Sequence, residues 1–184
     1  MDKDIKADLY RYYKYKGFSG LLKGMKIPGF RYIYFLRKAN KYKKYSLKGI
    51  ISRLILHWMG NRYGFQIRVN AKIGKGFYIG HFGTILIGSE VVIGSNCNIT
   101  HNVTIGNAIK GKLKGVPIIG DNVWMGTGAV IVGKIKIGSN VLIAPNSFVT
   151  FNVPDNSSVI GNPAKIIRMN NNPVDGYINY TLER

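Results

Sequence analysis

Between residue 67 and residue 153 the chain repeats one hydrophobic position every six residues. Glycine often follows the hydrophobic residue, and a small or β-branched residue usually comes four positions after it. The repeated positions are Ile67, Ile73, Ile79, Ile85, Ile87, Ile93, Ile99 and Ile105, then Ile119, Met125, Ile131, Ile137, Ile143 and Val149. A helix is disfavoured, because a glycine every six residues would cost about 1 kcal/mol each. Three six-residue units per coil predict a left-handed parallel β-helix, in which each aliphatic side chain stacks on its equivalent one coil later.

Two interruptions of the repeat are candidate loops. Two extra residues fall between Ile85 and Ile87, and a longer excursion spans residues 107–117 and carries three lysines. Insertions in solenoids form loops on one face, which is often the binding face. The excursion is therefore either a solvated basic turn or a loop beside an anionic cofactor or acceptor.

The pattern changes near residue 62, where the repeat begins. Before it, aromatic and aliphatic residues are interleaved with Lys and Arg in a way that predicts helices over residues 4–17, 29–45 and 46–60. We place the breaks between them at Gly17–Gly20, Pro28–Gly29 and Ser46. The predicted organisation is a helical N-terminal region (1–62), a β-helix domain (63–168, with the loop 107–117) and a C-terminal tail (169–184).

Charge separates the two regions further. The 184 residues include 27 Lys and Arg against 8 Asp and Glu, and residues 1–62 hold sixteen of the basic residues and three of the acidic ones. Cations interleaved with Leu, Ile and Phe suit an interfacial helix on anionic lipid, so residues 5–60 are a candidate for peripheral membrane contact. Alternatively, these helices cap the open end of the β-helix and mediate oligomer contacts. We expect no nucleic-acid binding, because the chain shows no known nucleic-acid motif.

Other features narrow the class of protein. One cysteine, Cys97, excludes a disulfide scaffold and a multi-thiolate metal site. No run of 18 apolar residues is present, and the polar start is unlike a signal peptide. We expect a cytoplasmic protein, peripheral at the inner face of the cell membrane if its basic helices bind lipid.

The three histidines are the candidates for acid/base chemistry. His57 lies in an apolar helical run, which favours a structural role, whereas His81 and His101 are each the third residue of their unit. Counting units places His81 and His101 on one face in adjacent coils, about 4.8 Å apart. An imidazole suits proton transfer near neutral pH. A polar surface stack is the alternative. A two-histidine metal site is disfavoured, although Asp121 shares the phase if the loop counts as one unit, and we expect no metal.

Residues 66–167 resemble the hexapeptide-repeat acyltransferases, in particular the serine O-acetyltransferase branch. The segment KIGKGFYIGHFGTILIGSEVVIG (72–94) is similar to the signature of that branch, and VIGNPAKII (159–167) is similar to its closing coil. The resemblance implies that His81 is the general base. It also implies a homotrimer that binds acetyl-CoA in the groove between neighbouring β-helices.

Two positions depart from the serine O-acetyltransferase pattern. Gln66 stands where that branch has the aspartate that orients the catalytic histidine, and Val116 stands where it has a second histidine. These departures, with the strings IGHFGTI and KGVPIIGDNVWMG, are more similar to the bacterial polysaccharide O-acetyltransferases of the colanic-acid and capsule type. We therefore expect a sugar hydroxyl of a capsular polysaccharide or exopolysaccharide as the acceptor. The alternatives are serine O-acetyltransferase of cysteine biosynthesis, transfer to a xenobiotic or nucleotide-linked amino sugar, and a non-catalytic β-helix scaffold at a membrane.

The resemblance assigns roles to further residues. His101 is a candidate for orienting the imidazole or contacting the acceptor, and Gln66 for a partner of the His81 imidazole. A backbone N–H would stabilise the oxyanion, and Cys97 is expected to be a core residue with no part in the reaction. The positions that match the family's contacts to acetyl-CoA are Asn107, Gly126, Thr127, Ala144 and Pro145, with Lys165 as a candidate partner of the CoA phosphate.

Overall fold

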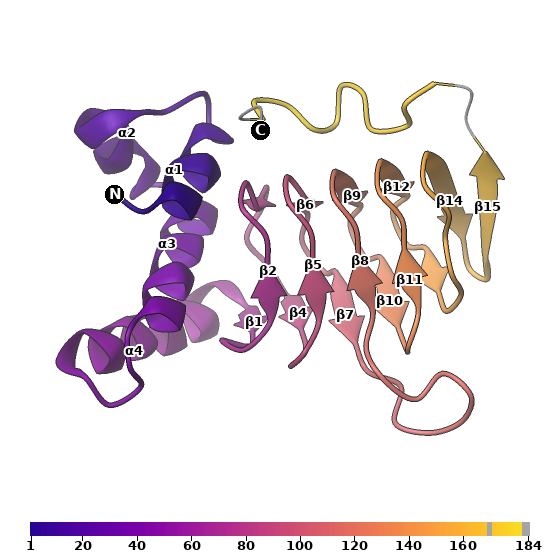
Figure 1. Ribbon diagram of the computed structural model, residues 1–184, viewed down its shortest axis with the longest axis horizontal. Coiled ribbons are helices and arrows are strands. Elements are labelled where there is room, and N and C mark those ends of the chain that lie inside the picture. Colours follow the sequence, from indigo (N-terminus) through magenta and orange to yellow (C-terminus); the bar gives the residue numbers. More distant parts are fainter. Residues whose placement is uncertain (169–170, 182–184) are drawn as a thin grey trace.

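The structure is a computed structural model that describes residues 1–168 and 171–181. Four helices form one end of the described chain, and a β-solenoid extends away from them (Figure 1). The helices are α1 (Lys3–Tyr10), α2 (Gly17–Gly24), α3 (Pro28–Lys41) and α4 (Leu47–Tyr63). The predicted fold, a left-handed parallel β-helix behind an α-helical N-terminal region, is confirmed.

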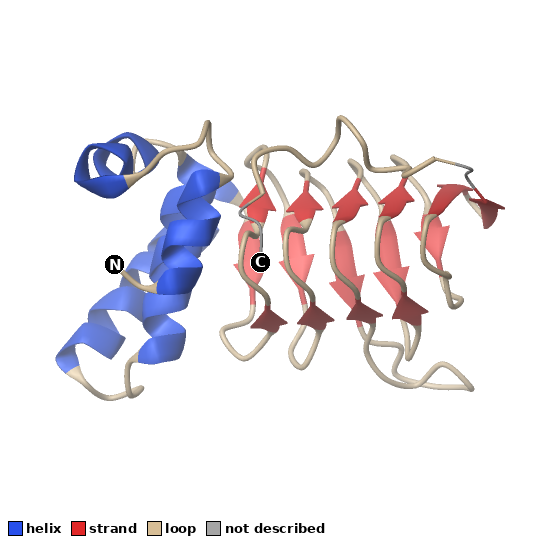
Figure 2. Cartoon of the chain, turned by 45° about the horizontal axis from the view of Figure 1, so that its top comes forward, coloured by secondary structure: helices blue, strands red, loops and turns tan. Residues whose placement is uncertain are grey.

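Each coil of the solenoid contributes one short strand to each of three faces (Figure 2). The first face is β1 (Phe65–Ile67), β4 (Ile85–Ile87), β7 (Thr104–Gly106), β10 (Val130–Val132) and β13 (Phe148–Val149). The second is β2 (Lys72–Ile73), β5 (Val92–Ile93), β8 (Ile118–Ile119) and β11 (Lys136–Ile137). The third is β3 (Tyr78–Ile79), β6 (Asn98–Ile99), β9 (Val123–Met125), β12 (Val141–Ile143), β14 (Ser157–Gly161) and the antiparallel closing strand β15 (Ala164–Arg168).

The repeated aliphatic positions form the core, as the six-residue period predicts. All of them are buried except Ile73, which is half-buried in the first coil. Equivalent residues pair directly, for example Ile79 with Ile99 and Ile99 with Met125. The stacked side chains therefore give one apolar column that runs the length of the solenoid.

The two-residue insertion lies elsewhere than the sequence pattern suggests. Ile79 pairs with Ile99, twenty positions on, whereas Leu86 pairs with Thr104, eighteen positions on. The extra residues therefore fall between Ile79 and Leu86, in the corner that carries His81. The prediction was wrong because Ile85 and Ile87 point inward from one strand, as alternate residues of a strand do. The second break was placed correctly, and loop 107–117 joins β7 to β8.

The helices close the first coil through buried polar contacts. The Tyr12 hydroxyl hydrogen-bonds both the N–H (3.0 Å) and the carbonyl (3.1 Å) of Ile79. Arg37 pairs with the fully buried Asp8 and also donates to the carbonyls of Ile73 and Gly74. Backbone groups that would be unpaired at the end of the solenoid are thereby satisfied.

The helix boundaries differ from the predicted ones in α1 and α2. α1 ends at Tyr10, and residues 17–24, where we placed a break, form α2. The glycines in this segment allow close packing rather than ending a helix. A Cβ on Gly20 would lie 3.1 Å from Tyr15, and one on Gly24 would lie 2.6 Å from the Leu9 side chain.

The segment 171–181 runs back along the solenoid towards the helices (Figure 1). Asn98 donates to the Tyr177 carbonyl at 2.8 Å, the rings of Trp124 and Tyr177 lie 4.8 Å apart, and Arg11 donates to the Asn179 carbonyl at 2.8 Å. This segment therefore links the second and third coils to α1. Within the residues described, no helix has the length and apolar character needed to cross a membrane.

Candidate active site

His81 and His101 lie together at one corner of the solenoid. They follow β3 and β6, which are neighbouring strands of the third face, and their ring centroids are 5.8 Å apart with the rings perpendicular. His81 is exposed, whereas His101 is half-buried. His101 Nδ1 is buried and has no hydrogen-bond partner among the described residues. The predicted placement in adjacent coils is confirmed, and it leaves one imidazole open to a bound substrate.

The corner is shaped by the end of α4 and by Gly83. The Gly83 N–H donates to the Tyr63 carbonyl at 2.9 Å, and the Phe82 ring packs 5.7 Å from the Tyr63 ring. Gly83 has φ +141°, and a Cβ there would lie 2.9 Å from the His101 Cβ. The inserted turn thus folds back against α4 and over His101, so this chain needs glycine at that position.

Four residues with a predicted role in binding acetyl-CoA lie at the same corner of the solenoid, in later coils. Thr127 and Pro145 occupy the turn positions after β9 and β12, with Gly126 and Ala144 immediately before them. The turns are tied together, since Gly128 N donates to the His101 carbonyl at 3.2 Å and Asn146 N to the Thr127 carbonyl at 2.8 Å. We call this row of turns from His81 to Pro145 the histidine corner. Its later turns are lined by small residues, which suits the slender arm of a pantetheine group.

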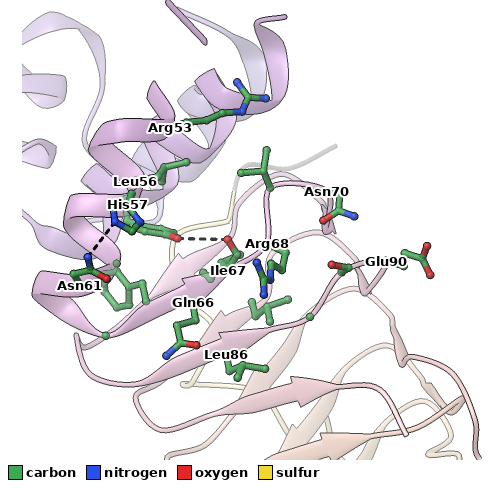
Figure 3. Close-up of a pocket in the computed structure, with 18 of the residues that line it drawn as sticks. Arg53, Leu56, His57, Asn61, Gln66, Ile67, Arg68, Asn70, Leu86 and Glu90 are labelled. Atoms are coloured by element: carbon green, nitrogen blue, oxygen red, sulfur yellow. Dashed lines mark hydrogen bonds between the residues drawn. The ribbon is translucent and has the colours of Figure 1, made fainter. Parts of the chain in front are cut away.

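Gln66 and Asn107 lie away from this corner. They line a groove of about 1260 Å³ between α4 and the first face, together with Val116 (Figure 3). Gln66 stands in the middle of β1, paired with Leu86, and makes no hydrogen bond to His81. Within the single chain the structure therefore does not bring Gln66 to the imidazole. Lys165 is also separate, exposed on the closing strand β15.

The groove contains polar residues that the sequence reasoning missed. Arg53, His57 and Asn61 of α4 line it together with Arg68, and Asn61 Nδ2 lies 3.3 Å from His57 Nε2 (Figure 3). His57 is exposed, so it is not part of the buried core, and the structural role expected for it stays a prediction. The four-residue spacing of positions 53, 57 and 61 was the available signal, because such residues share one face of a helix.

Asp121 does not join the histidines. It follows β8 on the second face, and its Oδ1 accepts a hydrogen bond from Ser95 N at 2.7 Å. Asp121 occupies the same position in its six-residue unit as the two histidines. Because the loop 107–117 does not form a unit of its own, Asp121 falls on the second face and not on the third. Over the described ranges, no three His, Cys, Asp or Glu side chains are grouped as a metal site requires.

Cys97 is a core residue, as expected. It is completely buried, and its thiol lies 3.2 Å from the Gly120 carbonyl. Burial raises the pKa of the Cys97 thiol to about 12. A thiol that stays protonated and inaccessible at neutral pH cannot serve as a nucleophile.

A comparison with known protein families identifies the class of protein to which this chain belongs. Residues 117–150 match the family model described as bacterial transferase hexapeptide (six repeats). The chain belongs to the hexapeptide-repeat transferases. Within that class it has serine acetyltransferase homologues.

Three of these homologues show how far the similarity extends. Serine acetyltransferase of Staphylococcus aureus (strain Mu50) is 39% identical over 131 residues, which are 71% of this chain and 60% of that protein. Soybean serine acetyltransferase complexed with serine superposes with a TM-score of 0.74 and 31% identity, covering 88% of this chain and 67% of that one. The Brucella abortus enzyme in complex with coenzyme A superposes with a TM-score of 0.74 and 28% identity, covering 91% and 67%. The chain spans about a third to 60% of the length of the first curated relatives.

These homologues overturn the expected sugar acceptor. The prediction of capsular or exopolysaccharide O-acetylation was wrong, because the homologues and the structural neighbours are serine acetyltransferases. That prediction relied on Gln66 and Val116. Within the single chain, the structure places both in the groove beside α4 rather than at the histidine corner.

Proposed function

We propose that this chain transfers the acetyl group of acetyl-CoA to the hydroxyl of L-serine. The observation that carries the proposal is the exposed His81 imidazole at the head of the histidine corner. Support comes from the homologues, since the soybean enzyme was solved with serine and the Brucella enzyme with coenzyme A. The proposed acceptor, serine, is therefore one that the sequence analysis gave only as an alternative to a sugar hydroxyl.

In this reaction His81 acts as the general base. Its imidazole takes the proton of the serine hydroxyl as the oxygen attacks the thioester carbonyl, and the carbon–sulfur bond then breaks. The proton passes to the departing CoA sulfur, which leaves as a thiol, so the base is regenerated. His101, perpendicular to His81 at 5.8 Å between centroids, limits the orientations that the His81 ring can take.

The donor would lie along the histidine corner. A Cβ on Gly126 would lie 2.7 Å from Pro145 N, so glycine lets this turn pack closely against the turn of the next coil. The small side chains of Thr127 and Ala144 in these turns suit the pantetheine arm. Lys165, exposed on the closing strand, is the proposed contact for a CoA phosphate.

We assign the remaining candidates to a neighbouring protomer. In a homotrimer of parallel solenoids, the groove of one copy faces the corner of the next. That arrangement would bring Gln66 and Asn107 of one protomer towards the acetyl donor bound at His81 of another. The trimer is thus part of the proposal, and light scattering on the purified protein measures its mass directly.

The test measures thiol release from acetyl-CoA with L-serine, using wild type, His81→Ala and Lys136→Ala. Lys136 is an exposed residue on the second face and serves as the control. We expect turnover with serine, none with O-methyl-L-serine, and a loss of about 10²–10⁴-fold in His81→Ala at unchanged melting temperature. Lys136→Ala should match wild type.

Other results would contradict the proposal in distinguishable ways. Acetyl-CoA binding without turnover on serine would show that the acceptor is wrong. Absence of binding would favour the non-catalytic scaffold. Full activity of His81→Ala would show that His81 is not the general base.

A further inference from the structure

The short helix α2 exposes two large apolar side chains, although Leu21 of the same helix packs against the core. Its two buried residues are Gly20 and Gly24, while Phe18 is 76% exposed and Leu22 is 53% exposed. Phe18 and Leu22 are four residues apart and so share one face of the helix. Tyr13, just before the helix, is 69% exposed. We call this set of three side chains the α2 surface. It presents large apolar groups outward where a water-facing helix presents polar ones.

Lysines surround the α2 surface. Lys14, Lys16, Lys23 and Lys26 are all exposed in the same segment. From Asp8 to Glu90 the chain contains seventeen basic residues and no acidic residue between them. An apolar tip with a rim of cations is the arrangement by which peripheral proteins meet a negatively charged membrane.

A groove opens beside the same helix. It has a volume of about 760 Å³, lies between α1, α2 and α3, and has aromatic walls that include Tyr10, Tyr34 and Phe18. Lys16 Nζ sits 5.1 Å from the centre of the Tyr10 ring, and Lys38 Nζ sits 5.3 Å from that of Tyr34. Lys6 lines it as well, and none of the described residues that line it carries a carboxylate. The groove thus combines fixed cations with an apolar wall, which suits a phosphate joined to a hydrocarbon.

We propose that the α2 surface and its groove dock this protein on an anionic lipid bilayer. Phe18 and Leu22 enter the acyl-chain boundary, and the lysines of the groove contact lipid phosphates. A second copy of the chain is the less suitable occupant, because it would bring an equally basic surface against this one. α2 lies at the end of the molecule opposite the closing strand (Figure 1).

The test is sedimentation of the full chain with vesicles of phosphatidylcholine alone or with about a third phosphatidylglycerol, at low and high salt. We expect binding to the anionic vesicles only, and loss of that binding at high salt. The double variant Phe18→Ser/Leu22→Ser should lower the partition coefficient at least about tenfold. Lys16→Gln/Lys23→Gln should lower it about 25-fold, which corresponds to about fivefold per lysine.

Matched controls test whether vesicle binding depends on the α2 surface or only on the number of exposed basic and apolar residues. Ile160→Ser/Ile167→Ser removes two similarly exposed apolar side chains from the closing hairpin, and Lys72→Gln/Lys136→Gln removes two exposed lysines from the second face. Both controls should bind like wild type. Equal binding to neutral vesicles, no binding at all, or equal losses in test and control variants would overturn the proposal. So would a smaller particle mass for Phe18→Ser/Leu22→Ser without lipid, which would identify an interface between copies.

Discussion

Among single residues, Gly83 most directly decides the geometry of the histidine corner. Its φ of +141° lies in the region that disfavours a side chain, and its Cα faces His101. The N–H of the same residue is held by the Tyr63 carbonyl, so the turn cannot simply move outward. A methyl group there must displace His101 or release the turn from α4.

We therefore expect Gly83→Ala to impair the site as well as the fold. The backbone strain should cost about 1–3 kcal/mol of unfolding free energy, and displacement of His101 should lower kcat more than it raises the KM for acetyl-CoA. Gly176→Ala is the control, since Gly176 has φ +78° with open space around its Cα. Gly176→Ala therefore places a side chain at a positive φ without bringing it into contact with another residue. Chemical denaturation and thiol-release kinetics measure the two effects, and an unchanged kcat in Gly83→Ala would contradict the role given to this turn.

The sequence predicted the histidine pair but could not predict what surrounds it. Counting six-residue units suffices to place His81 and His101 in adjacent coils, because one coil contributes one turn at each corner. The position of the insertion could not be counted, since Ile85 and Ile87 both satisfy the inward pattern. The isolation of Gln66 from His81 depends on which face each occupies, and the family spacing alone does not give that.

Among the elements, α1 and α3 are joined by two ion pairs in contrasting environments. Asp8 is completely buried and accepts two hydrogen bonds from Arg37, at 2.9 and 3.1 Å, and one from Phe77 N. Asp2 and Lys41 form a pair of similar length, 3.0 Å, that is largely exposed. Burial raises the pKa of the Asp8 carboxyl, and the Arg37 charge opposes that rise.

The two pairs predict very different losses of unfolding free energy when the aspartate is replaced by asparagine. Asp8→Asn leaves the Arg37 guanidinium without a counter-charge in a mostly buried position, so we expect a loss of about 3–5 kcal/mol. Asp2→Asn should cost at most about 1 kcal/mol, because water screens the exposed pair. Urea unfolding of both variants at pH 7 gives the comparison. Equal losses would show that the buried pair does not hold α1 and α3 onto the first coil.

The helices were harder to predict than the strands for a physical reason. The solenoid imposes one period on every coil, so its strands repeat a single signal along the chain. The helices pack against one another and the first coil, and a glycine in α2 can mean either a break or a close contact. Gly20 and Gly24 meet Tyr15 and Leu9, residues whose positions depend on the tertiary structure.

At the scale of the whole molecule, the class of protein was predictable and the acceptor was not. The repeat extends over residues 67–153 and allows few alternatives, so it indicated an acyltransferase fold from periodicity and resemblance together. The acceptor was inferred from two positions, Gln66 and Val116, that the fold places in a groove away from His81. Differences at isolated positions are weak evidence about a substrate when their place in the structure is unknown.

Arg11 connects parts of the molecule that are distant in sequence. It is 4% exposed and donates to the Gly76 carbonyl and to Asn98 Oδ1, both at 2.6 Å, and to the Asn179 carbonyl. These acceptors belong to the first coil, the second coil and the returning segment 171–181. One side chain therefore joins α1 to both the start of the solenoid and its C-terminal segment.

Because of these contacts, Arg11→Met should loosen the C-terminal segment as well as destabilise the fold. Methionine retains much of the apolar contact but leaves three acceptors unpaired, at about 1–3 kcal/mol for each that stays buried. We expect a loss of about 3 kcal/mol or more in denaturant unfolding, with faster hydrogen exchange at the Tyr177 and Ile178 amides, which bond to the Val174 carbonyl. Arg168→Met, an exposed position on β15, is the control and should change neither quantity. If the Tyr177 and Ile178 amides exchanged at the wild-type rate in Arg11→Met, the segment would be held by the Trp124 and Asn98 contacts alone. The link from α1 through Arg11 would then have no part in fixing the segment against the solenoid.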